Sequence, residues 1–153
     1  KNPSAYLEYV CSLLKTNNET FAKGVVKLIL KLLKTNPELI SPVYKKMEGA
    51  WLHANPLTVK INIQFMKMLG VIDKKFYLSV YQNYKLSREP IFAEILSNAI
   101  VFYDETIDCM VTNWAASGNV KLKKAGIAVT VRSSRGQNIL AACGQLSGKT
   151  QKD

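Results

Sequence analysis

Glycine, proline, histidine and acidic residues are scarce in this chain of 153 residues. It holds 8 Gly, 5 Pro and 1 His, and its 11 Asp and Glu are outnumbered by 21 Lys and Arg. Because Gly and Pro break helices and build turns, their scarcity argues against a linker-rich chain and favours an all-α protein. The single histidine, His53, has no His or Cys close to it in sequence, which argues against a zinc site.

Cysteines and long apolar runs are also few. The three cysteines are odd in number and far apart, at Cys11, Cys109 and Cys143. Without a Cys-x-x-Cys pair they are typical of small buried hydrophobes in a reducing compartment. The most apolar run, residues 25–33, is interrupted by Lys27 and Lys31 and is too short to cross a bilayer. No signal peptide is visible, so we expect no membrane span and an intracellular protein, cytoplasmic or nuclear.

Charge is what the chain has in excess. The net charge of +10 favours an acidic protein surface, RNA or DNA, or an anionic membrane as a partner. The alternative is a lysine-rich surface with no ligand, since helix exteriors tolerate lysine freely. The chain begins with Lys rather than Met, which predicts that it is a segment of a longer protein.

Apolar periodicity predicts a succession of helices. The first, over residues 4–14, is expected to bury Tyr6, Val10, Leu13 and Leu14. Capping-box spacings at 16–19 and 35–38 predict two further helix starts. Gly70 is expected to end one helix and Asp73 to cap the next. The expected helices cover about 4–14, 18–34, 39–53, 56–69, 74–84, 88–102, 104–114 and 119–131, with a short strand at 129–131 as the alternative for the last.

Two tryptophans mark an internal similarity. Trp51 and Trp114 each end an apolar-periodic segment, a turn follows, and eight residues after each Trp an aliphatic residue precedes Lys. Related aliphatic/charged steps recur at intervals of 37, 34 and 29 residues. The steps are Ala22-Lys23, Val59-Lys60, Ala93-Glu94 and Leu122-Lys123. This pattern is typical of a repeated unit of helix, turn and helix.

The turn Asn55-Pro56 followed by Val59-Lys60 resembles the HEAT and armadillo class of helical repeat. The resemblance implies a right-handed α-solenoid-like stack of about four antiparallel helix pairs. It makes residues 1–136 a single helical-repeat domain and 137–153 a short helical turn with a flexible C-terminal tail. The Ala93-Glu94 step departs from the pattern in charge, and the Ala22 step lacks the Pro. The alternative is an irregular helical bundle.

A scaffold that binds another protein is the function this architecture favours. The second helices would line a concave basic face that takes an acidic helix or peptide. The alternative is an RNA- or DNA-binding domain that contacts the phosphate backbone. The candidate contacts are Lys23, Lys27, Lys60, Lys67, Lys121, Lys123, Lys124, Arg132 and Arg135.

Motifs for catalysis, metals and cofactors are weak. The segment 144–150 ends in Gly-Lys-Thr, but its spacing misses a P-loop by one residue. The acids at Asp104, Glu105 and Asp108 fit the start of a helix better than a metal site. We therefore expect no cofactor, no metal and no enzyme, with a DNA-modifying enzyme on a HEAT-like fold as the remote alternative. A tyrosine stripe at Tyr77, Tyr81 and Tyr84 is expected to be core rather than a base-stacking platform.

Overall fold

A computed structural model describes residues 2–83 and 88–133, and in these ranges every regular element is a helix. The protein is therefore all-α, as predicted. The α-helices are α1 (Pro3–Ser12), α2 (Glu19–Thr35), α3 (Ile40–Gly49), α4 (Pro56–Ile72), α5 (Lys74–Tyr81), α6 (Pro90–Asn98) and α7 (Glu105–Ala115). A further α-helix covers 120–133, and short 3-10 turns η1 (Leu13–Lys15), η2 (Pro37–Leu39) and η3 (Trp51–His53) join the earlier ones.

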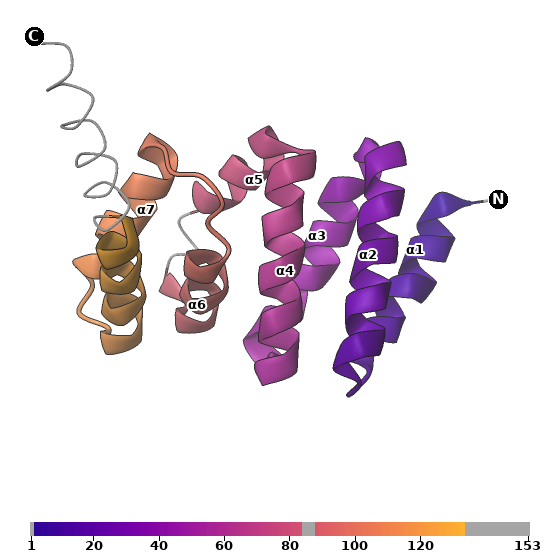
Figure 1. Ribbon diagram of the computed structural model, residues 1–153, viewed down its shortest axis with the longest axis horizontal. Helices are drawn as coiled ribbons and strands as arrows, with labels where there is room; N and C mark the ends of the chain where they lie inside the picture. The colour runs from indigo at the N-terminus through magenta and orange to yellow at the C-terminus, as the bar shows by residue number, and fades with distance from the viewer. Residues whose placement is uncertain (1, 84–87, 134–153) are drawn as a thin grey trace, which may run out of the picture.

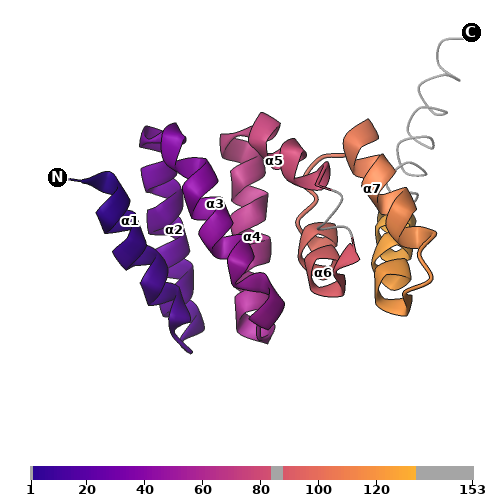
Figure 2. The ribbon, with the colours of Figure 1, turned by 180° about the vertical axis from the view of Figure 1, so that it is seen from behind.

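The helices lie side by side in chain order along the longest axis of the molecule (Figure 1). The view from behind shows the same order, with α1 and α2 at one end and α7 and the helix 120–133 at the other (Figure 2). Contacts run between neighbours and between alternate helices, as in α1 on α2, α2 on α4, α4 on α6, and α5 on α7. The predicted tail over 137–153 lies outside the described residues.

Asx side chains start four of the helices, α2, α4, α5 and α7. The side-chain oxygens of Asn18, Asn55, Asp73 and Asp104 each accept a hydrogen bond from the backbone N–H three residues on. Each bond satisfies one of the four amides that a helix leaves unpaired at its start. The predicted cap at Asp73 is confirmed.

The helix starts predicted at 16–19 and 35–38 are confirmed, at Glu19 of α2 and Pro37 of η2, but neither threonine makes the capping-box hydrogen bond. The Thr16 hydroxyl accepts from the amide of Asn18 instead of Glu19, because Asn18 itself caps α2. The Thr35 hydroxyl donates back to the carbonyl of Leu32 and closes the end of α2. A threonine hydroxyl at a helix end can either accept a hydrogen bond from an amide or donate one to a carbonyl.

Two further local predictions are corrected, and the helix predicted over 119–131 is confirmed against its alternative, a strand at 129–131. Tyr6 is exposed, since Leu7 and Val10 form the buried stripe of α1. Gly70 does not end α4, which runs on to Ile72. A Cβ at this buried glycine would lie 2.9 Å from the Val101 side chain, so its smallness serves packing. Residues 129–131 form part of an α-helix and no strand.

The core is a continuous apolar cluster that runs through the whole row of helices. Its largest fully buried side chains include Trp51, Trp114, Tyr77 and Tyr81. The tyrosine stripe is core, as expected for its first two members, and Tyr84 lies outside the described residues. No helix in the described part of the chain combines the length and hydropathy that crossing a bilayer requires.

The recurrent aliphatic/charged steps share one arrangement. The first residue of each step is buried and the second is exposed. The four steps lie on alternate helices, namely α2, α4, α6 and the helix 120–133. The step therefore sits at the boundary between the core and the exposed side of these helices.

Candidate binding surfaces

The lysines of α2 form an exposed stripe that includes Lys23 and Lys27. Lys23 is paired with Glu19 one helical turn before it, at 2.7 Å. The hydrogen bond from Lys23, followed by the charges of Lys23 and Lys60, lowers the pKa of Glu19 below its ordinary value. The charge of Lys60 acts on Glu19 because α4 packs beside α2.

Lys60 and Lys67 are both exposed on α4, seven residues apart. Seven residues are close to two helical turns, so the two ammonium groups lie on the same side of the helix. Between them, Asn62 turns inward, where its amide donates to the carbonyl of Thr58 at 2.8 Å. The face of α4 that bears the lysines is thus separate from the face that enters the core.

A groove of about 720 Å³ separates α6 from the helix 120–133. The wall on α6 is made of Pro90, Ile91, Glu94, Ser97 and Asn98. The wall on the last helix is made of Lys121, Lys124, Ala125, Ala128, Val131 and Arg132. Three of the predicted contact residues therefore come together here, beside an apolar floor.

Arg132 fixes how the two walls are aligned. Its guanidinium donates to the Ser97 carbonyl at 3.0 Å and to the Asn98 side chain at 3.5 Å, both at the C-terminal end of α6. A cation at the end of a helix also interacts favourably with the helix dipole. Since Lys121 and Pro90 also line the groove while Arg132 contacts the C-terminal end of α6, the two helices run in the same direction. Their N-terminal ends, with Pro90 and Lys121, lie together at the other end of the groove.

Five of the remaining predicted residues are described, and they do not line the groove. Lys123 is exposed on the helix 120–133 but does not line it, and Arg135 lies outside the described residues. The floor residues Ala125 and Ala128 were not predicted from the sequence. Their spacing of three residues on a lysine-rich helix was the available signal, because small side chains there leave room between neighbouring helices.

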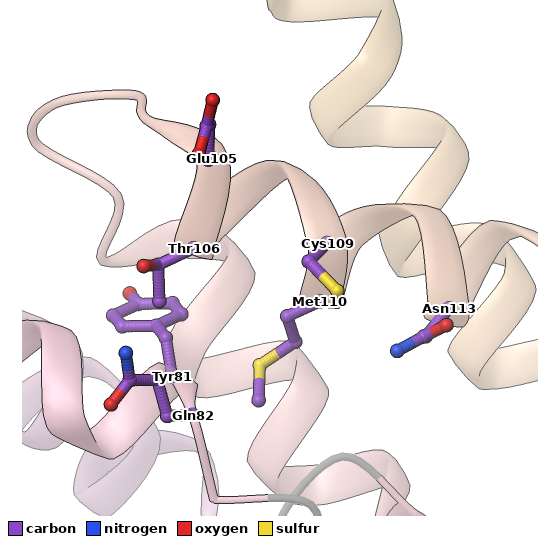
Figure 3. Close-up of a pocket in the computed structure, with 7 residues that line it drawn as sticks. All are labelled: Tyr81, Gln82, Glu105, Thr106, Cys109, Met110 and Asn113. Atoms are coloured by element: carbon purple, nitrogen blue, oxygen red, sulfur yellow. The ribbon is translucent and has the colours of Figure 1, made fainter.

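A second hollow of about 390 Å³ lies between the end of α5 and α7. Tyr81 and Gln82 form one side, and residues from Glu105 to Asn113 form the other (Figure 3). The thiol of Cys109 and the thioether of Met110 lie between Thr106 and Asn113 along α7 (Figure 3). The cysteine is exposed, contrary to the expected buried thiol.

The acids around the start of α7 have structural partners. Asp104 caps the helix, and Asp108 accepts a hydrogen bond from the Tyr103 hydroxyl at 2.8 Å. Partial burial, followed by this bond and the charge of Asp108, raises the pKa of Tyr103 to about 12. Within the described ranges no group of three or more His, Cys, Asp or Glu side chains is arranged to hold a metal ion.

Comparison of the chain with protein-family models, curated proteins and solved structures finds no match.

Proposed function

We propose that this protein is an interaction scaffold whose helices form a right-handed, solenoid-like stack of antiparallel pairs. The order of the helices along one axis supports this arrangement, as do the contacts between alternate helices. The four buried/exposed steps at equivalent places in the second helices support it further. In such a stack each pair has more apolar surface than it can bury alone, so it packs on its neighbours.

The partner we propose is an acidic protein segment, bound as a helix or peptide along the second helices. The observation that carries this is the exposure of lysines on three of the four second helices. Complementary charge steers encounter and fixes the register of such complexes. Amphipathic helices also bind readily in grooves between helices. The exposed lysines are Lys23, Lys27, Lys60, Lys67, Lys121, Lys123 and Lys124.

Charge reversal on α4 tests the proposal. A fluorescent amphipathic helical peptide, with glutamates on one side and leucines on the other, is titrated with the protein at low salt. We expect Lys60→Glu/Lys67→Glu to weaken binding severalfold, because two attractions become repulsions. Lys45→Glu/Lys75→Glu is the matched control. It changes the net charge equally, but at exposed positions on the first helices, α3 and α5.

Unchanged binding by Lys60→Glu/Lys67→Glu would contradict the proposed face. A parallel titration with single-stranded RNA and duplex DNA tests the other class of acidic ligand. Tight binding that falls log-linearly with salt would assign the lysines to a phosphate backbone instead.

A further inference from the structure

We propose that the groove between α6 and the helix 120–133 is the docking point for the acidic partner. In this proposal the groove takes an amphipathic segment with apolar side chains on its floor and two carboxylates at Lys121 and Lys124. The inference rests on the proposed function and narrows it to one place and one ligand pattern.

The floor of the groove supplies the apolar part of the site. Ile91 contributes from α6, and Ala125, Ala128 and Val131 contribute from the last helix. Val131 remains 43% exposed in the free protein. Burying such surface against apolar side chains of a partner is favourable at roughly 25 cal/mol per Å². A concave apolar floor with a few charged groups at its edge is the usual form of a binding site.

Charge is distributed unevenly along the groove. Lys121 and Lys124 lie at the end where both helices begin, and both are exposed. Within the described ranges no carboxylate lies within 4.0 Å of either ammonium group. The positive ends of two helix dipoles add to the same potential. This end of the groove therefore favours negative charge.

The other two charged residues of the groove limit how a partner lies in it. Arg132 is held by the C-terminal end of α6, so it acts as part of the wall more than as a free anchor. Glu94 lies on the opposite wall, midway along α6, and repels an acid placed there. A bound segment is thus expected to place its acids toward Lys121 and to keep its middle apolar.

The experiment uses the same labelled acidic peptide and two variants of the groove. Lys121→Glu/Lys124→Glu reverses the charged end, and Ala128→Trp fills the floor without any change of charge. We expect each to weaken binding by about tenfold or more. Circular dichroism and thermal unfolding are measured on both variants to check that they fold. Lys45→Glu/Lys75→Glu again controls for net charge.

The outcomes separate the groove from the broader proposal. If both groove variants bind the peptide like wild type while Lys60→Glu/Lys67→Glu binds it more weakly, the groove is not the docking point. The proposed function then stands. If the groove variants are weakened and the α4 variant is not, the groove stands without the wider face. Absence of binding by the wild-type protein at low salt overturns both, and preferential binding of RNA or DNA replaces the acidic protein partner.

Discussion

The two halves of the molecule join successive helices by different means. In the first half, α2 and α4 are 17 residues long each and pack mainly through apolar side chains. In the second half, α5, α6 and α7 have 8, 9 and 11 residues. There, buried tyrosines and Arg132 donate hydrogen bonds to the carbonyl groups at the end of α6.

The short length of α6 accounts for part of the difference. Every helix leaves its last four carbonyl groups without a partner of its own, so a short helix has a larger share of them. Tyr77 and Tyr81 supply the donors for Ala99 and Leu96, at 2.8 and 2.7 Å. Short helices also cover less of their neighbours. Both hollows lie in this half, which is where we place the partner.

The largest expected effect comes from Gly126, where the second half is packed most closely. A Cβ there would contact the backbone of Ala115 and lie 2.9 Å from the carbonyl carbon of Trp114. Because backbone cannot move aside as a flexible side chain can, Gly126→Ala is expected to destabilise the fold by about 3 kcal/mol. Chemical denaturation measures this, and wild-type stability of the variant would show that α7 and the last helix are not in close contact.

The next effect tests the hydroxyl network of the second half. Tyr77→Phe removes the donor to Ala99 and the acceptor for the amide of Val101, which lies 3.3 Å from the hydroxyl. Leaving such buried groups unpaired costs about 1–3 kcal/mol. Tyr9→Phe in the first half is the matched control, since Tyr9 is 63% exposed. Equal stabilities of the two variants would show that the network contributes nothing.

Alkaline pH should weaken the same network. Burial is the main cause that raises the pKa of Tyr77 and Tyr81 above the ordinary 10.0. Below pH 10 both tyrosines are neutral in the folded and unfolded states, so their contribution is constant. Above pH 10 the unfolded chain loses these protons first, and the free energy of unfolding falls as pH rises.

The double variant Tyr77→Phe/Tyr81→Phe should therefore show a shallower decline in stability above pH 10 than wild type. Some decline remains, because burial also raises the pKa of Tyr44 and Tyr103. Denaturation curves of both proteins, measured at pH 9 and above, compare their free energies of unfolding around the ordinary tyrosine pKa. Parallel declines in the two proteins would contradict it.

The smallest expected effect is a gain in stability from a substitution in the first half. Gly24 is exposed within α2, and a Cβ there would meet nothing within 4 Å. Alanine favours the helix over glycine by roughly 0.5–1 kcal/mol, so Gly24→Ala should stabilise the protein by about that amount. This change in stability is opposite in sign to that expected for Gly126→Ala. A loss of stability would show that α2 needs glycine at this position.

Much of the fold could be predicted from local patterns. The helical class, the cap at Asp73 and the buried faces of the later helices follow from periodicity and composition, which act over a few residues. The errors came where two local options compete. Asn18 caps α2 in place of Thr16, and Gly70 lies inside α4 because Val101 and Tyr77 pack against it. The first outcome is a competition between residues two apart, whereas the second depends on Val101, which is far from Gly70 in sequence.

The sequence by itself determined an all-α chain with a large excess of positive charge, because scarcity of helix breakers and the lysine count are properties of composition. It also placed the lysines on the exposed sides of their helices, since periodicity separates polar from apolar faces. Only the tertiary structure decided that Lys121, Lys124 and Arg132 line one groove while Lys123 does not. That choice depends on how α6 and the last helix align, which Arg132 and the end of α6 fix across 35 residues of chain.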